Sequence, residues 1–356
     1  MSRVLRPHGE LHVLARQLLE QTKHPVLGAE SALTKTLGDR LLSELHSHNT
    51  PSTLYYVLAD GETYVVKVEF GHAQTLRDEI QWYRDAARRG LSTHLFITGH
   101  AGPSMSFLLL KCFGDGSTVD DLALGGASAG ELGRHIGRAV DRDIELFHRT
   151  QRHVSPSHVH RLTERRLAQR RRQASAFVYL RTLMDADVIT INGNEVTGAY
   201  RCLNHIIGNP HWVSHLAPDR IGVTFGDLHC GNIIVDGVST EVVDPRGGPL
   251  LPLTYDYGKL VQSIEGGYGA VMAGRYVLRR TGRTEYEFAT ENVPGYADLG
   301  VLLPIGRDER LYLQSLYQAA LHFVAMLPHH ASAEEETTAL YLCGVSLFDK
   351  LLARLS

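Results

Sequence analysis

Three oxygen-bearing side chains follow one another in the second half of the chain and suit chemistry on a phosphate group. Asp227 and Asn232 lie in residues 224–232, which read TFGDLHCGN, and Asp244 lies in residues 243–247, which read VDPRG. The Asp227 carboxylate can accept a proton from a hydroxyl group, and Asn232 and Asp244 offer the oxygen ligands that Mg2+ takes. Because phosphoryl transfer needs mainly positioning and charge neutralisation, this order predicts a base and two metal ligands acting on a nucleotide.

A lysine in an apolar strand pattern is the second chemical feature. Residues 64–68 read YVVKV, and a lysine in such a strand can reach the α- and β-phosphates of ATP. Glu79 falls in a helical pattern over residues 73–89 and can pair with Lys67. Alone, these two residues fit a solvent-facing strand edge and a solvated helix face. Together with Asp227 further along the chain, they favour a nucleotide-binding interpretation.

The elements before residue 115 are mostly strands. The Asp60-Gly61 pair signals a hairpin, and the 73–89 helix separates two pairs of strands. Apolar strand patterns cover residues 54–58, 64–68, 94–98 and 106–113, after a helical spacing over residues 12–45.

Helical patterns dominate the rest of the chain, so the change near residue 115 predicts two lobes of the α+β class. The 223–244 segment is predicted as short strands around a loop, with a turn at Asp236-Gly237, and another turn is expected at 192–194. The predicted helices cover residues 128–150, 156–183, 197–217, 255–279, 309–326 and 335–354.

The run GDLHCGN at 226–232, followed by DPRG at 244–247, resembles the aminoglycoside phosphotransferase/choline kinase family. The resemblance implies a two-lobed protein-kinase-like fold. A small antiparallel-sheet, nucleotide-binding lobe would span residues 1–113, with a hinge at about 108–115. A larger, mostly helical lobe at 116–356 would carry catalysis and acceptor binding.

The form of the downstream segments is most similar to the bacterial sugar- and polysaccharide-associated members of that family. These segments are DPRG itself, the run YDYGKL at 255–260 and MLPH at 326–329.

The resemblance also assigns roles. Asp227 matches the catalytic base, or the residue that orients the acceptor hydroxyl, and Asn232 and Asp244 match the ligands of Mg2+. Lys67, paired with Glu79, would hold the phosphates of ATP.

Further positions would contact the nucleotide or support the loop. The backbone of 108–113, including Lys111 and Phe113, would bond the adenine edge, and Asp256 would bond the backbone of the catalytic loop. The turn over residues 46–53 stands where protein kinases have a glycine-rich loop, and its Ser52 and Thr53 hydroxyls could cap phosphates.

One residue departs from the family pattern. Phe225 stands where a histidine usually precedes Gly-Asp. Phenylalanine can fill the space behind the loop but cannot donate a hydrogen bond. This departure, with the missing glycine-rich loop, favours an alternative: a catalytically idle, kinase-like binding or regulatory protein.

Other charged groups near these motifs leave two interpretations open. Arg246 could contact a phosphate or anchor its own loop, and His229 could approach substrate or be a packed polar group. The arginine-rich stretch could be a solvated helix face or could contact an anionic acceptor such as a phosphorylated sugar or nucleotide. Its members are Arg161, Arg165, Arg166, Arg170, Arg171 and Arg172.

Composition excludes several classes of protein. The 356 residues carry a formal net charge of −3, so no global positive field recruits nucleic acid. Four widely spaced cysteines form no CxxC pair, which argues against a zinc site or a disulfide framework. The polar start of the chain and the lack of long apolar runs predict no signal peptide and no membrane span, hence a cytoplasmic protein.

These observations predict an ATP- and Mg2+-dependent small-molecule kinase, a phosphotransferase with an alcohol group as acceptor. The acceptor hydroxyl would belong to a sugar, an amino sugar or a nucleoside-like compound. An aminoglycoside O-phosphotransferase that confers resistance is an alternative, as is the idle protein. A protein kinase ranks last because the His-Arg-Asp and Ala-Pro-Glu segments are absent. The acceptor, ATP against GTP, and the oligomeric state stay open.

Overall fold

A computed structural model gives the architecture of the chain, which divides into two compact units, Met1–Phe113 and Gly114–Ser356. Within the described residues, no helix is long and apolar enough to cross a membrane. The structure describes residues 41–45, 53–59, 62–70, 74–90, 95–102, 105–113, 116–297 and 308–356.

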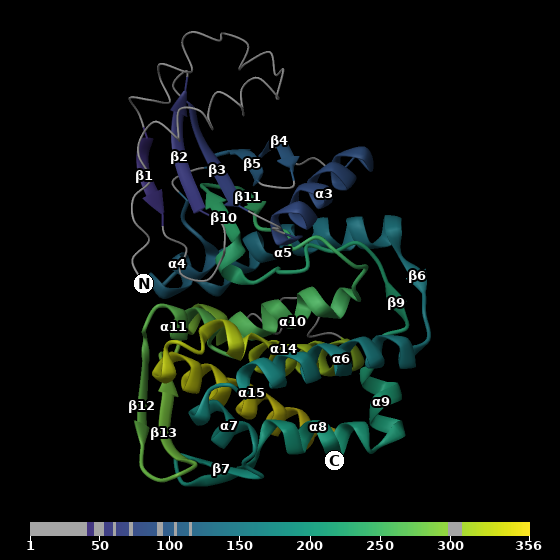
Figure 1. Ribbon diagram of the computed structural model, residues 1–356, viewed down its shortest axis with the longest axis vertical. Coiled ribbons are helices and arrows are strands. Elements are labelled where there is room, and N and C mark those ends of the chain that lie inside the picture. The colour runs from purple at the N-terminus through teal and green to yellow at the C-terminus, as the bar shows by residue number, and fades with distance from the viewer. Residues whose placement is uncertain are drawn as a thin grey trace. The chain divides into compact units, whose positions relative to one another are not determined.

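The described residues of the first unit form an antiparallel sheet with helix α3 beside it (Figure 1). Alternate residues of the central strand β3, such as Val66 and Val68, are buried apolar side chains. Helix α3 buries Leu76, Ile80 and Tyr83, which recur at helical spacing and give it an apolar face. The strands, in sheet order, are β1 (Leu41–Leu45), β2 (Thr53–Ala59), β3 (Glu62–Phe70), β5 (Met105–Lys111) and β4 (Phe96–Ala101), and α3 is Gln74–Arg88.

The helical pattern predicted up to residue 45 is wrong at its end. Residues Leu41–Leu45 form β1 and pair antiparallel with β2. Cross-strand pairing in a sheet outweighs the local helical spacing here. The rest of that pattern, residues 12–40, lies outside the described residues. So do residues 46–52 of the turn predicted over 46–53, whose last residue begins β2, and the turn predicted at 60–61, although Ala59 and Glu62 on either side of that second turn are paired.

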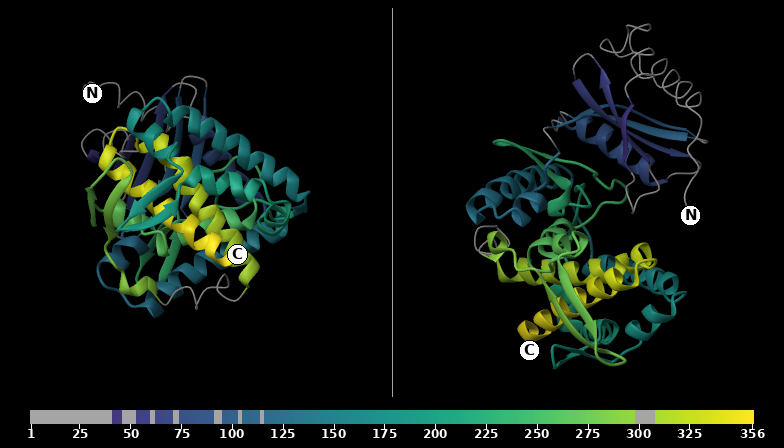
Figure 2. Two further views of the ribbon diagram at one scale, coloured as in Figure 1. Left: turned by 90° about the horizontal axis from the view of Figure 1, so that it is seen from below. Right: turned by 90° about the vertical axis from the view of Figure 1, so that its left-hand side faces the viewer.

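The second unit is built on helices packed around α14 (Glu309–His330) (Figures 1 and 2). Helix α14 is apolar on most of its circumference and is therefore buried. It contacts α10 (Leu253–Ile264), α15 (Glu334–Leu355) and α6 (Pro156–Ala174). A Cβ atom at Gly258 would lie 2.5 Å from the Gln318 Cβ, so this glycine allows α10 to approach α14 closely.

Small hairpins interrupt the helices of this unit. The turn predicted at 192–194 is confirmed, with Asn192 and Gly193 at φ of 54° and 81° between β7 (Val188–Ile191) and β8 (Asn194–Thr197). The helix predicted over 255–279 is wrong beyond α11, because Tyr276–Arg280 form β12, which pairs with β13. The remaining elements are α4 (Val119–Leu124), α5 (Ala129–Thr150), β6 (Arg152–His153), α7 (Val178–Met184), β7 (Val188–Ile191), β8 (Asn194–Thr197), α8 (Ala199–Ile207), α9 (Pro210–Leu216), β9 (Arg220–Ile221), η1 (Cys230–Asn232), β10 (Ile233–Asp236), β11 (Ser239–Val242), α11 (Tyr268–Met272), β13 (Glu285–Thr290) and α12 (Pro294–Ala297).

Candidate active site

The loop that carries Asp227 is held in place through hydrogen bonds from its backbone N–H groups to a buried carboxylate. The N–H groups of Gly226 and Leu228 donate to the two carboxylate oxygens of Asp256, at 2.8 and 3.2 Å. Gly226 has φ of 75°, a left-handed conformation that glycine adopts readily. The sharp turn at Gly226, fixed from α10, therefore sets the direction in which Asp227 leaves the loop. Asp256 is fully buried, as its predicted supporting role requires.

A second buried carboxyl group holds the same loop from α5. The Phe225 N–H donates to Asp143 Oδ1 at 3.0 Å, and Asp143 is fully buried. Burial, with the nearby Asp256 carboxyl, raises the pKa of Asp143 well above its usual range. At Asp256 burial also raises the pKa, but the two donated N–H groups oppose the rise. Asp143 is therefore the member of the pair that holds a proton.

Asp227 forms an ion pair with a lysine on α10. Lys259 Nζ lies 2.8 Å from Asp227 Oδ1. Burial alone would raise the pKa of Asp227, but the positive charges of Lys259 and Arg246 outweigh it and lower the pKa below its usual range. An anion this stable accepts a proton weakly. Asp227 is thus better suited to orient a hydroxyl than to act as a strong base.

The two predicted metal ligands stand at the base of one hairpin. Strands β10 and β11 pair with Ile233 opposite Val242, and one step further the Val243 N–H donates to the Asn232 carbonyl at 3.0 Å. This pairing brings Asn232 beside Asp244. Asp244 has φ of 56°, which is uncommon for a residue other than glycine and is better tolerated by aspartate and asparagine than by most residues.

These two residues suit Mg2+. The Asn232 side-chain nitrogen donates to the Asp227 carbonyl at 3.0 Å, so its side-chain oxygen is the atom that faces a cation. One carboxylate and one amide oxygen, completed by phosphates and water, make a set that Mg2+ accepts. Within the described residues, no three His, Cys, Asp or Glu side chains gather into a metal site.

Two residues left open by the sequence have structural contacts. His229 Nδ1 accepts the Gly231 N–H at 3.1 Å, and the His229 ring packs edge-on against Tyr268. Burial lowers the pKa of His229, so the ring is neutral and caps the short helix η1. Phe225 is 3% exposed. Because its N–H is bonded to Asp143, the loop is fixed without a hydrogen-bonding side chain at this position.

In the first unit, Lys67 and Glu79 form a buried ion pair. Lys67 Nζ lies 3.0 Å from both carboxylate oxygens of Glu79, and the two residues are 7% and 5% exposed. Sheet pairing places Lys67 between Leu54 and Leu108. Neither a solvent-facing strand edge nor a solvated helix face describes these two residues.

The other predicted nucleotide contacts are less defined. Ser52 lies outside the described residues, and Thr53 begins β2. Lys111 is exposed at the end of β5, opposite Tyr64, and Phe113 is half-buried at the end of the first unit.

Lys259 and Asp143 are site residues that sequence reasoning missed. Both had a signal. Lys259 follows Asp256 by three residues, which places them on one face of α10. Asp143 interrupts an apolar stripe on α5 between Val140 and Leu146, where an acid calls for a buried partner.

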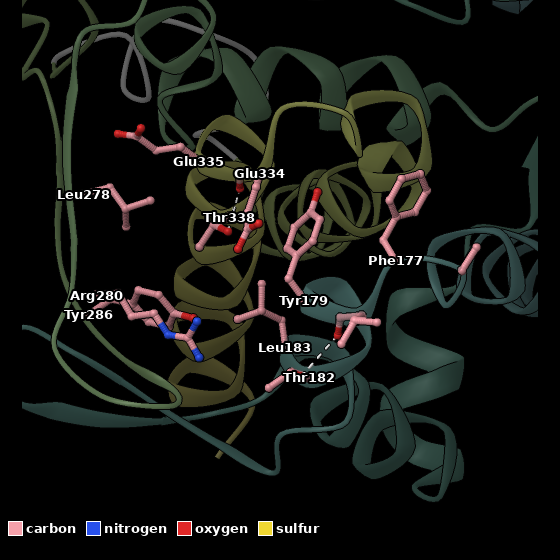
Figure 3. Close-up of a pocket in the computed structure, with 12 residues that line it drawn as sticks. Phe177, Tyr179, Thr182, Leu183, Leu278, Arg280, Tyr286, Glu334, Glu335 and Thr338 are labelled. Atoms are coloured by element: carbon pink, nitrogen blue, oxygen red, sulfur yellow. Dashed lines mark hydrogen bonds between the residues drawn. The ribbon is translucent and has the colours of Figure 1, made fainter.

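A large hollow of about 810 Å3 lies elsewhere in the second unit (Figure 3). Phe177, Tyr179 and Leu183 line one side, and Arg280 of β12 and Glu334 of α15 are also part of the lining. Asp227, Asn232, Asp244 and their partners do not line it. Size alone therefore does not identify the reactive site.

Comparison with known proteins bears on the family and the fold of the chain. The model of the phosphotransferase enzyme family matches residues 43–289, more than half of the chain. No curated protein matches.

Solved structures with a similar fold include two kinds of kinase. One is a glucosamine kinase in complex with glucosamine, ADP and inorganic phosphate, with a TM-score of 0.51 at 15% identity over 87% of this chain and 76% of that chain. Another is the aminoglycoside phosphotransferase APH(4)-Ia, with a TM-score of 0.51 at 13% identity over 87% of this chain and 94% of that chain. At these identities the likeness shows the fold, and the predicted two-lobed, kinase-like α+β fold is confirmed.

Proposed function

The chain belongs to the phosphotransferase enzyme family, and from that premise we propose that it is an ATP- and Mg2+-dependent small-molecule kinase. The acceptor is a hydroxyl group of a sugar, an amino sugar or a nucleoside-like compound. The observation that carries the proposal is the placement of Asp227 on a backbone-anchored loop, followed by Asn232 and Asp244 at the base of one hairpin.

Each residue has a role in the transfer. Asp227 accepts a hydrogen bond from the acceptor hydroxyl and orients its oxygen toward the γ-phosphorus. The new O–P bond forms as the bond from the γ-phosphorus to the bridging oxygen breaks. ADP leaves with that electron pair, and the hydroxyl proton passes to the Asp227 carboxylate late, as the new O–P bond makes the hydroxyl acidic enough for a weak base.

The nucleotide phosphates need positive charge. Lys67, held by Glu79, supplies one cation for them. Asn232 and Asp244 would hold Mg2+, which neutralises charge on the phosphates when bound. The backbone of 108–113 is proposed to bond the adenine edge.

The central test is the Asp227→Ala variant of the full chain. ADP release would be measured over sugars, amino sugars, aminoglycosides, nucleosides and choline. We expect Asp227→Ala to lose turnover by about 100-fold or more, with Mg-ATP binding largely intact by thermal shift. Asp236→Ala is the matched control, because Asp236 is an exposed aspartate at the end of β10. Unchanged turnover in the Asp227 variant would overturn the assignment.

The same screen separates the alternatives. An idle binding protein would show a thermal shift with Mg-ATP but neither ATP hydrolysis nor transfer to any acceptor. A resistance enzyme would act on aminoglycosides in preference to simple sugars. The intact Lys67–Glu79 pair and the anchored loop favour an active kinase over the idle protein.

A further inference from the structure

The arginine-rich stretch of α6 divides into three groups. Arg171 is committed to structure, because it pairs with Asp185 at 2.8 Å and its guanidinium lies 4.4 Å from the Tyr200 ring centroid. Arg166 and Arg170 lie one turn apart and are half-buried. The exposed members are Arg161, Arg165 and Arg172. Among the described residues, only the second group is therefore half-buried without a carboxylate partner.

Arg166 meets Arg246, which follows the Asp244 hairpin, at one tyrosine of α10. Both guanidinium groups donate to the Tyr255 hydroxyl, at 2.7 and 2.8 Å. The Arg246 N–H also donates to the Phe225 carbonyl at 2.7 Å, which ties this arginine to the Asp227 loop. Two cations thus share one hydroxyl oxygen, and their two hydrogen bonds occupy both of its lone pairs. Arg166 Nε is buried without a hydrogen-bond partner.

Two further cations belong to the same cluster. Burial and the charges of Arg166 and Arg246 lower the pKa of Arg170. Lys259 lies one turn after Tyr255 on α10 and reaches Asp227. We call Arg166, Arg170, Arg246 and Lys259 the cation cluster.

The cation cluster has too little negative charge of its own. Asp227 pairs with Lys259, and Tyr255 and the Asp227 and Asp256 carboxylates raise the pKa of Arg246. Within the described part of the chain, however, no carboxylate lies at ion-pair distance from Arg166, Arg170 or Arg246. The two histidines beside the cluster, His322 and His329, are neutral and do not change its charge. Burial and nearby cations lower the pKa of His322 well below its usual range and lower that of His329 to about 4.

We propose that the cation cluster binds an anionic group, a phosphate or a carboxylate, carried by the acceptor whose hydroxyl Asp227 orients. Guanidinium groups with unused donors match phosphate and carboxylate oxygens in a bidentate manner. Such an anion would accept a hydrogen bond from Arg166 Nε, which has no other partner, and its charge would reduce the repulsion among the arginines. The inference rests on the proposed function and narrows its substrate class to anionic hydroxyl compounds, in contrast to a cationic aminoglycoside.

The first test measures binding and needs no turnover. Inorganic phosphate is titrated by calorimetry into the full chain saturated with Mg2+ and a non-hydrolysable ATP analogue, so that the γ-phosphate position is filled. We expect phosphate to bind wild type and Arg170→Ala to weaken binding by about 10-fold or more. Arg166→Lys keeps the positive charge but loses the paired N–H donors of the guanidinium group. It should weaken phosphate binding less than Arg166→Ala does. Arg172→Ala, on the exposed face of α6, is the matched control.

Several outcomes would overturn the inference. Phosphate that fails to bind the nucleotide-loaded protein but binds the nucleotide-free protein would assign the cluster to the γ-phosphate. Equal weakening by Arg170→Ala and Arg172→Ala would show only nonspecific attraction. Arg170→Ala is the safer variant, because among the described residues the one hydrogen bond that its side chain loses is to Gln173 on the surface of the same helix.

The second test compares acceptors in charge-matched pairs, such as glucose with glucose 6-phosphate or glucuronate, and ribose with ribose 5-phosphate. We expect transfer only to anionic members, with phosphate as a competitive inhibitor. Transfer to neutral or cationic members alone would overturn this inference and leave the proposed kinase intact. Loss of Mg-ATP binding and of all transfer would count against the kinase itself, while phosphate binding would still report on the cluster.

Discussion

At the scale of single residues, the Lys67–Glu79 pair combines a structural and a functional role that can be separated. Both side chains are buried in the first unit. Removing one partner deprives the other buried charge of this opposite charge, and breaking a buried ion pair in this way costs about 3–5 kcal/mol, whereas replacing both residues with apolar groups is often neutral.

We therefore predict that Lys67→Met lowers both the free energy of unfolding and the affinity for Mg-ATP. The double variant Lys67→Met/Glu79→Leu should recover most of the unfolding free energy and none of the nucleotide affinity. Denaturant unfolding and nucleotide titration of the two variants check this. Recovery of nucleotide affinity in the double variant would show that Lys67 acts only through packing.

At the scale of elements, helices α5 and α10 fix the Asp227 loop through a pair of buried carboxyl groups. Asp143 holds the Phe225 N–H, and Asp256 holds the N–H groups of Gly226 and Leu228. Because the pKa of Asp143 is raised, the folded state binds a proton that the unfolded chain releases near pH 4. Stability therefore falls as pH rises from about 4 to the folded-state pKa.

We predict that Asp143→Asn removes this fall in stability. The amide keeps an oxygen for the Phe225 N–H and supplies a permanent donor toward Asp256. Between pH 5 and pH 8 the free energy of unfolding of wild type should decrease more than that of the variant. The two decreases should differ by about 1.4 kcal/mol for each unit by which folding raises the pKa of Asp143 within that range. Turnover should be retained in Asp143→Asn.

Asp143→Leu is the contrasting variant. It removes the Asp143 acceptor of the buried Phe225 N–H, which should lower the free energy of unfolding by about 1–3 kcal/mol. Because the Asp227 loop is then less well fixed, kcat should fall while the KM for ATP changes little. Identical pH profiles of stability for wild type and Asp143→Asn would show that Asp143 does not hold the proton.

The elements that hold the site differ in how far the sequence predicts them. The sequence predicts short strands around a loop over 223–244 because Asp236-Gly237 is a strong turn signal, and β10 and β11 form as expected. Strand β12 was missed because its residues continue a helical pattern and only pairing with β13 makes them extended. Asp143 lies 82 positions before the Phe225 N–H that it holds, a contact that only the tertiary fold creates.

At the scale of the whole molecule, nucleotide binding should appear as added stability, because a ligand that binds only the folded state shifts unfolding by mass action. Asp244 is the residue that links this effect to Mg2+. Its left-handed backbone is one that asparagine also tolerates, so Asp244→Asn removes the charge with little added strain.

We predict that ATP with Mg2+, at 100 times its dissociation constant, stabilises the protein by about 2.7 kcal/mol. Chelating the metal should remove most of that gain, and Mg2+ without nucleotide should give little. Asp244→Asn should keep the unfolding midpoint of the free protein but need a higher Mg2+ concentration for the same shift. Calorimetry of both proteins over a series of Mg2+ concentrations measures these shifts. If Asp244→Asn and wild type respond identically to Mg2+, Asp244 does not bind the metal, and the Mg2+ dependence must arise from other residues.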